Sequence, residues 1–464
     1  MKNKRLVAGL LALTFVFGGA ALPTGVVSNN TVISASAEEL TYGNFTYTML
    51  EDGTIEISKY TGSETAVEIP SEIDGVAVTS IGDYSFINCI FTSVVIPDSI
   101  TNIGKEAFRG CNKLIEVTIP NSVETLGEHA FSGCVALESV VISKNLTAIN
   151  YGTFYGCKKL TSITLPYGIT SVGSTAFSGC TSLKNIDLPD SVTTIDSHAF
   201  YNCTALKNIN IPNGVLSLGD SAFNTCTSLE SLVLPNGMTS IGERAFYECT
   251  KLASISMPDS ITSIGAYAFQ NCVSLAKVKI PAGVTRIAGY TFNNCDSLTN
   301  VTIPDGVERL EGYSFSNLDN LAIITIPESV TSIVNTLFVN SNQSFRVYCY
   351  NGSYAENYSL KNKINFRILD LQEPTDYPMI NGIDFNKESH QFRLKWTPVE
   401  GASEYGIATQ VAGKWRVQAQ KITATSFTSP KNLTPNSTYK IAIAAKVNGV
   451  WDTENAIKNA VTVK

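Results

Sequence analysis

Apolar residues recur along most of this chain with a period of 23 residues. Each repeat carries a Phe, and all but the last two carry a Cys three residues later, usually followed by a Leu after three more, as in Phe108, Cys111 and Leu114. A fixed period of roughly 20 to 50 residues is typical of repeat architectures. The spacing therefore predicts a stack of similar coils, whose cysteines are Cys89, Cys111, Cys134, Cys157, Cys180, Cys203, Cys226, Cys249, Cys272 and Cys295.

One coil, residues 192–215, shows how the pattern predicts local structure. Ile209 and Ile211 alternate with polar residues, which indicates a short strand with one apolar face. Pro212 lacks a backbone donor and ends that strand, and the Asn-Gly pair after it supplies a turn. The apolar residues of one coil cannot be buried within that coil, so we expect stability to come from stacking.

The repeat predicts a leucine-rich-repeat solenoid of about 12 coils of 23 residues with short parallel strands, over residues 66–340. A solenoid must be closed at both ends, because an open coil exposes apolar area and strand edges. We expect a hairpin in residues 38–65 as the N-terminal cap. We expect a helix and a closing strand in residues 341–370 as the C-terminal cap. The coils are counted by Phe86, Phe108, Phe131, Phe154, Phe177, Phe200, Phe223, Phe246, Phe269, Phe292, Phe315 and Phe338.

The aligned cysteines are predicted to be free thiols. Equivalent side chains on stacked coils point the same way, so their Cβ atoms stay about 4.7 to 4.9 Å apart, one strand spacing. A disulfide requires Cβ atoms about 3.5 to 4.5 Å apart. Cysteine is a small apolar residue that is often buried, and a buried ladder of thiols fits the spacing better than bridges do.

The chain changes character near Asp370. Residues 371–378 contain two Pro and predict a linker, and residues 379–464 read as alternating strands with hairpin turns. Leu433-Thr434-Pro435-Asn436-Ser437-Thr438-Tyr439 resembles the corner motif of fibronectin type III domains, and Trp396 is similar to their core Trp. This resemblance implies an all-β sandwich. In that topology the hairpins before Trp415 and Trp451 lie at opposite ends, so we expect core or rim packing for each rather than a joint stacking platform.

The first 37 residues are predicted to be a signal peptide. Lys2, Lys4 and Arg5 precede the apolar stretch 6–17, and Ala-Ser-Ala at 35–37 offers a cleavage site. The protein is therefore expected outside the cell, secreted or held at the surface non-covalently. No other stretch is predicted to span a membrane. The formal net charge of −7 and a pI of about 5.2 argue against nucleic acid as a partner.

The repeat unit resembles the BspA-type, or Treponema pallidum-type, leucine-rich repeat. The resemblance covers about residues 66–338 and is carried by units such as residues 261–275, ITSIGAYAFQNCVSL, followed by Val278-Lys279-Ile280-Pro281. It implies a bacterial or protozoan surface or secreted protein, and several members of this family are adhesins. The family has no shared catalytic residues, so the resemblance carries none over.

Little in the sequence indicates catalysis. His129 and His198 occupy the same repeat position three coils apart, roughly 14 Å, which excludes a shared metal. There is no Gly-rich phosphate loop, zinc-ligand spacing or nucleophile elbow. We therefore expect no catalytic residues, no metal site and no cofactor.

Polar side chains form two columns on the outward face of the Pro-ending strands. These outward columns are a candidate surface for a protein or glycan, and the alternative is a solvated sheet face with no ligand. Lys277 and Lys279 are the clustered positive charge within the columns, so they predict an acidic or anionic ligand nearby. The predicted ligand-binding residues are Asn185, Asp187, Asn208, Asn210, Ser254, Ser256, Lys277 and Lys279.

These features predict an exported, non-catalytic bacterial binding protein, adhesin-like, that recognises a host or neighbouring-cell protein or glycan through the solenoid surface. Two alternatives remain open: a structural or self-associating cell-surface protein, and an accessory polysaccharide-binding protein. An enzyme is the hypothesis that the residue inventory supports least.

Overall fold

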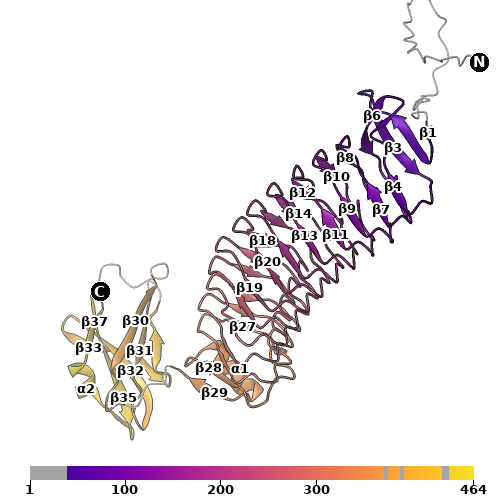
Figure 1. Cartoon of the computed structure of the whole chain (residues 1–464). Helices are drawn as coiled ribbons and strands as arrows, with labels where there is room; N and C mark the ends of the chain where they lie inside the picture. Colours follow the sequence, from indigo (N-terminus) through magenta and orange to yellow (C-terminus); the bar gives the residue numbers. More distant parts are fainter. Residues whose placement is uncertain (1–38, 370–374, 387–390, 431–437, 464) are drawn as a thin grey trace, which may run out of the picture. The chain divides into compact units, whose positions relative to one another are not determined.

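The structure is a computed structural model that describes residues 39–369, 375–386, 391–430 and 438–463. Two rows of short parallel strands run along a solenoid, and two antiparallel sheets follow it in the chain (Figure 1). The predicted architecture is confirmed for both parts. The predicted signal peptide lies outside the described residues.

Most strands of the first row are separated from a following Pro by a single residue, and we call this row the Pro-ending row. Its strands are parallel, and between residues 93 and 349 the paired strands join residues 23 positions apart, such as Ser162 with Asn185, so the 23-residue period is the stacking register. In most of its strands a buried residue lies between two exposed ones. The row comprises β4 (Ala66–Glu68), β7 (Ser93–Val95), β9 (Glu116–Thr118), β11 (Ser139–Val141), β13 (Ser162–Thr164), β15 (Asn185–Asp187), β17 (Asn208–Ile209), β19 (Ser231–Val233), β21 (Ser254–Ser256), β24 (Asn300–Thr302), β26 (Ile323–Thr325), β28 (Arg346–Cys349) and β29 (Phe366–Ile368).

The second row is formed by shorter strands, most of them two residues long, each with one apolar residue turned inward. It begins with β6 (Val76–Ile81), which also pairs with β5 (Glu72–Ile73). The row continues through β8 (Asn102–Ile103), β10 (Thr125–Leu126), β12 (Ala148–Ile149), β14 (Ser171–Val172), β16 (Thr194–Ile195), β18 (Ser217–Leu218), β20 (Ser240–Ile241), β22 (Ser263–Ile264), β23 (Arg286–Ile287), β25 (Arg309–Leu310) and β27 (Ser332–Ile333).

The core between the rows is a ladder of stacked phenylalanines. From Phe86 to Phe315 the ring centroids of successive coils are 5.0 to 5.9 Å apart and the rings are nearly parallel. Aromatic pairs of this kind contribute about 0.5 to 1.5 kcal/mol beyond the area they bury. At the last coil the stack tilts, with Phe338 6.5 Å from Phe315.

The ten aligned cysteines are free thiols, as predicted, and nine of them are fully buried. From Cys111 to Cys295 each thiol donates a hydrogen bond to the carbonyl of the ladder Phe in the preceding coil, with Sγ–O distances of 3.1 to 3.3 Å. Two coils beyond Cys295, Ser341 occupies the same repeat position, and its hydroxyl donates to the Phe315 carbonyl at 2.8 Å. A small donor at this position therefore ties most coils to the preceding one, and Leu318 takes the position in the coil of Phe315.

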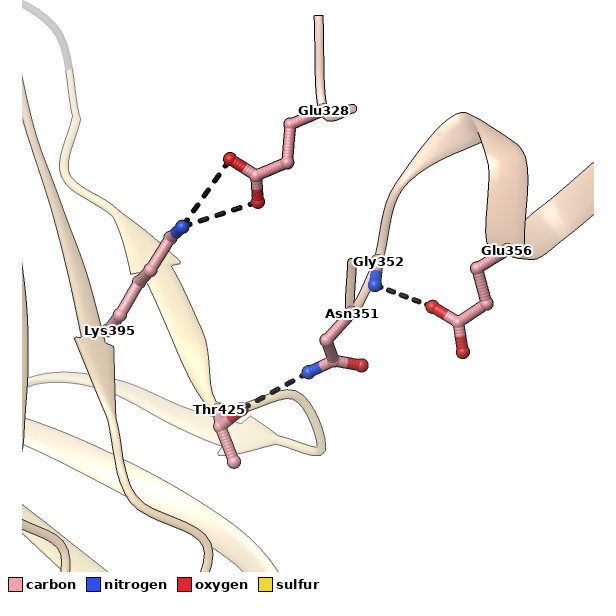
Figure 2. Close-up of polar contacts among 6 residues, drawn as sticks. All are labelled: Glu328, Asn351, Gly352, Glu356, Lys395 and Thr425. Carbon is pink, nitrogen blue, oxygen red and sulfur yellow. Dashed lines mark hydrogen bonds and ion pairs between the residues drawn. The ribbon is translucent and has the colours of Figure 1, made fainter. Parts of the chain in front are cut away.

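Both ends of the solenoid are covered. At the start, β1 (Leu40–Tyr42), β2 (Phe45–Met49) and β3 (Ile55–Tyr60) form an antiparallel meander that pairs with β6. At the end lies helix α1 (Tyr354–Asn362), where Ser353 caps the N-terminus and Glu356 accepts a hydrogen bond from the Gly352 amide at 2.6 Å (Figure 2). Figure 2 also draws two exposed polar contacts of this region, Glu328 with Lys395 and Asn351 with Thr425.

The remaining strands form two antiparallel sheets that share one core, a β-sandwich arrangement. Trp396 is 2% exposed and packs edge-on against Tyr405 of the other sheet, so its predicted core position is confirmed. Much of the predicted corner motif lies outside the described residues, and the fibronectin type III assignment stays a prediction. One sheet holds β30 (Ile380–Asn386), β31 (Gln391–Trp396) and β34 (Ser426–Thr428). The other holds β32 (Ala402–Val411), β33 (Lys414–Ile422), β35 (Tyr439–Val447), β36 (Val450–Trp451) and β37 (Val461–Val463), with helix α2 (Thr453–Lys458) beside it.

Within the part of the chain that the structure describes, no helix is long and apolar enough to cross a membrane. The same residues include no group of three or more His, Cys, Asp or Glu side chains placed to hold a metal ion.

Candidate functional site

The outward columns are exposed along the Pro-ending row, and the parallel register sets their members side by side. Asn185 pairs with Asn208 across β15 and β17, and Ser231 pairs with Ser254 across β19 and β21. Strand geometry places such neighbours about 4.8 Å apart. The columns thus present amides and hydroxyls at the spacing of the coils.

Within the described residues the Pro-ending row is interrupted at three places, between β11 and β13, between β17 and β19, and between β21 and β24. The second of these interruptions lies beside Asn210. Asn210 follows β17, and its side chain turns back onto the preceding coil. Its Oδ1 accepts a hydrogen bond from the Leu188 amide at 3.2 Å, and its Nδ2 donates to the Leu188 carbonyl at 3.1 Å. The side-chain amide thereby takes the place of a backbone partner of Leu188 on the side of β15. On the other side of the same coil, β17 and β19 belong to different sheets.

A hollow of about 790 Å³ lies over this interruption. Its lining holds four of the predicted ligand-binding residues and adds polar and apolar neighbours from the next coil. An amide can donate and accept hydrogen bonds and a carboxylate accepts them, so the hollow can bind a ligand rich in hydroxyl or amide groups. The lining residues include Asn185, Asp187, Asn208, Asn210, Asn213, Ser231 and Val233.

The other predicted residues lie along the row, outside the lining of the hollow. Ser254 and Ser256 are exposed on β21, and Lys277 makes an isolated bridge with Ser254. Lys279 Nζ lies 2.9 Å from Asp259 Oδ1, and the hydrogen bond and charge of the lysine lower the pKa of that carboxyl. Lys277 makes no ion pair within the described residues. The structure therefore brings four of the eight predicted residues together in the hollow and leaves the lysines about two coils away.

Sequence reasoning missed a tyrosine ladder at another repeat position. Tyr267, Tyr290 and Tyr313 stack with ring centroids 4.8 Å apart, and the Arg244 guanidinium lies 4.4 Å from the centre of the Tyr267 ring. Desolvation in the stack raises the pKa of the Tyr290 hydroxyl. The three tyrosines are 23 residues apart, and that spacing could have revealed them.

Within the tyrosine ladder the facing sides of the rings cover one another, and Arg244 lies over the outer face of Tyr267, so the ladder presents mainly edges and hydroxyls. It lies at the repeat position of His129 and His198, two residues before the ladder Phe. His129 instead contacts Tyr151, with ring centroids 4.7 Å apart. This position varies from coil to coil, which fits a solvated surface.

The expectation that Trp415 and Trp451 pack separately was wrong. The two hairpins do lie at opposite ends of β32. Trp415 pairs with Gln410, near the C-terminal end of β32. Trp451 pairs with Lys446, which in turn pairs with Glu404 near the N-terminal end. Both indoles nevertheless line the same pocket. Helix α2, which the sequence pattern did not predict, contributes the remaining side of that pocket.

Comparison with known proteins gives one consistent result for the solenoid. The BspA type leucine rich repeat region matches residues 79–180, 147–274, 217–345 and 262–373, well over half of the chain. A leucine-rich cell surface protein of Faecalibacterium prausnitzii is 33% identical with a TM-score of 0.51, over 70% of this chain and 98% of that one. A leucine-rich repeat protein of Bacteroides ovatus is 26% identical with a TM-score of 0.51, over 71% and 100%. No curated protein matches the chain.

Proposed function

This chain belongs to the BspA-type leucine-rich repeat family, and on that premise we propose that it is an exported, non-catalytic, adhesin-like binding protein. It recognises a protein or glycan outside the cell through the outward columns of the Pro-ending row. The similar protein from Faecalibacterium prausnitzii is described as a cell surface protein, which supports a location outside the cell. The proposed signal peptide in residues 1–37 supplies the route of export.

The observation that carries this proposal is the hollow at the interruption between β17 and β19. In a regular stack the outward columns form a flat, repetitive face with no preferred point of attachment. At the interruption beside Asn210 the face is not flat, and five polar side chains of the columns line one concave site. Concave sites with a few placed polar groups are where proteins usually hold small ligands or parts of larger ones.

The direct test is to probe an array of glycans and extracellular proteins with residues 38–464. A captured ligand is then measured against a variant with Asp187→Ala and Asn208→Ala, both exposed residues of the hollow. We expect at least tenfold weaker binding, because two hydrogen-bonding side chains are lost. A matched variant, Glu116→Ala with Thr118→Ala, removes two exposed column residues of β9 and is expected to bind normally. Equal losses in both variants would contradict the assignment, and binding only to further copies of the chain would favour the self-associating alternative.

The lysines define a second test of the same surface. Replacing Lys277 and Lys279 with Glu is expected to weaken an acidic or anionic ligand and to reduce the salt dependence of its binding. Lys277→Glu is expected to have the larger effect, because Lys279 already pairs with Asp259. Lys113→Glu, an exposed lysine of another coil, is the matched control. Unchanged affinity and salt dependence in the double variant would remove the lysines from the site.

A further inference from the structure

The outer face of the sheet β33–β32–β35–β36 carries a pocket of about 210 Å³. Its lining consists largely of small side chains on neighbouring strands, and Ala456 and Ile457 of helix α2 contribute as well. The indoles of Trp415 and Trp451 line it from β33 and β36. Ten of the twelve lining residues are apolar, and the two polar ones are Gln420 and Thr453, both exposed.

The small residues are what make this pocket possible. Trp451 lies so close to Gly406 that a Cβ at that position would be 3.1 Å from Cζ3 and 3.2 Å from Cη2 of the indole. Ala408, Ala442 and Ala444 also line the pocket. Large side chains at these positions would fill the space between the two indoles. The pocket therefore depends on a particular set of residues across three strands.

The two indoles differ in their surroundings from the third tryptophan of the chain. Trp396 is buried in the core of the sandwich, whereas Trp415 and Trp451 are half-buried. Lys446 Nζ lies 5.5 Å from the centre of the Trp451 ring and forms an ion pair with Glu404 at 2.7 Å. Half-buried indoles beside an open apolar space are well placed to pack against a ligand ring.

The charges around the pocket restrict the kind of ligand that it can bind. Residues 379–464 contain 11 Lys and Arg against 6 Asp and Glu, a formal net charge of +5, although the whole chain carries −7. Lys446 already provides a cation at Trp451, and no acidic side chain lines the pocket. A cationic ligand, which aromatic pockets otherwise favour, would be repelled here. An anionic ligand would be buried against a lining that contains no cationic side chain, which is costly without a paired charge. The pocket therefore favours a neutral occupant, with an apolar face for the indoles and hydrogen-bonding groups for Gln420 and Thr453.

We propose that this pocket binds one neutral sugar ring of a polysaccharide. A pyranose ring has a face of C–H groups, which can pack on an indole, and a rim of hydroxyls, which can pair with an amide and a hydroxyl. This site is separate from the hollow of the solenoid and does not rest on it. A chain with both sites could engage one surface at two points, which raises overall affinity when both are reached at once.

Intrinsic fluorescence tests the proposal, because two of the three tryptophans line the pocket. Residues 38–464 are titrated with cellohexaose, chitohexaose and mannohexaose, and with N-acetyltyrosine amide as a mimic of a protein side chain. We expect at least one saccharide to change the emission saturably. Trp415→Ala and Trp451→Ala should each weaken that saccharide at least tenfold, measured by calorimetry so that the readout does not depend on the removed fluorophore.

Ala444→Leu is the decisive variant, since it fills the pocket and leaves both indoles in place. It should also weaken binding at least tenfold, whereas the matched control Ala424→Leu, on an exposed loop outside the pocket, should bind normally. Thermal melts followed by circular dichroism establish that each variant is folded. The proposal is overturned if no saccharide binds, if binding survives in Ala444→Leu, or if only N-acetyltyrosine amide binds.

Discussion

At the scale of single residues, the ladder cysteines combine two roles in one small side chain. Each fills the core beside a stacked Phe, and from Cys111 onward each thiol donates to a carbonyl of the coil before it. The donor is used within the fold, so a thiol serves here as a weakly polar core residue rather than as a reactive group. Ser341 shows that a hydroxyl can take the same place.

We expect these thiols to be unreactive until the protein unfolds. Titration with a thiol reagent at pH 8 should detect few groups in the native protein, because burial excludes the reagent. After denaturation without reductant it should detect about eleven, the ten ladder cysteines and Cys349. A titre near one in denaturant would show that the ladder had oxidised to disulfides.

Because these thiols are buried, we expect the stability of the fold to decrease at alkaline pH. Desolvation raises the pKa of Cys180 and of Cys226 from 9.0 to about 12. Because the folded pKa lies above the unfolded one, the stabilisation is complete below pH 9 and is lost as the pH rises from 9 towards 12. At pH 10 the ionisation of each of these thiols in the unfolded chain should lower the unfolding free energy by about 1.4 kcal/mol.

Urea denaturation under reducing conditions at pH 8 and pH 10 measures this loss. The decrease in unfolding free energy between the two pH values should be smaller by about 3 kcal/mol in a Cys180→Ala, Cys226→Ala variant than in the native sequence. Comparing differences within each protein removes the cost of the substitutions themselves and the shared titration of the tyrosines. Identical decreases would show that these two thiols do not control the alkaline transition.

At the scale of the coil, close approach of backbones fixes particular positions. A Cβ on Gly127 would lie 2.4 Å from the carbonyl carbon of Gly104 and from the amide nitrogen of Lys105. Neither backbone atom can move without displacing the stacked coil. Glycine at this position therefore reflects packing between coils.

Gly127→Ala is expected to lower the unfolding free energy by about 1 to 3 kcal/mol, the usual cost of overpacking. Gly237→Ala is the matched control, since a Cβ there would meet only Leu216 Cδ2 at 3.5 Å and the Asn213 carbonyl at 3.9 Å. Urea denaturation of both variants measures the difference. Equal stability of the two variants would contradict the packing argument.

The regular features of the coils followed from the sequence, and the irregular ones did not. A 23-residue period fixes strand register, the Phe stack and the Cys ladder, since identical residues meet across coils. Asn210 looks in the sequence like any other outward polar residue. Only the folded geometry shows that its amide replaces a backbone partner of Leu188 and that the residue lines the hollow.

The sandwich shows a second reason for missed features. Alternating patterns predict its strands, the last of them running to Val463. In the structure six residues after Trp451 instead form α2, which is capped by Asp452. Without that helix the pocket of Trp415 and Trp451 has no third side. A short helix inside a β-rich segment leaves too weak a periodicity to be recognised.

At the scale of the whole molecule, the described residues contain two separate hydrophobic cores. One core extends from Tyr47 to Tyr358 through every coil of the solenoid, and the other, from Phe392 to Val463, joins the two sheets of the sandwich. A segment with its own core can in principle fold alone. The proposed boundary at residues 371–378 falls between the two cores.

We therefore expect residues 371–464, expressed alone, to fold. The core that they contain draws residues from both sheets, among them Trp396, Tyr405 and Ile443, and the solenoid contributes none of it. Heating should give a single cooperative transition, followed by near-ultraviolet circular dichroism and by the emission of buried Trp396. Trp396→Ala should abolish that transition or lower the unfolding free energy by about 3 to 5 kcal/mol, since it empties the centre of the core. Val450→Ala, a 70% exposed residue of β36, should leave it nearly unchanged. A chain that stays disordered would show that the sandwich needs the solenoid, and the boundary would then be misplaced.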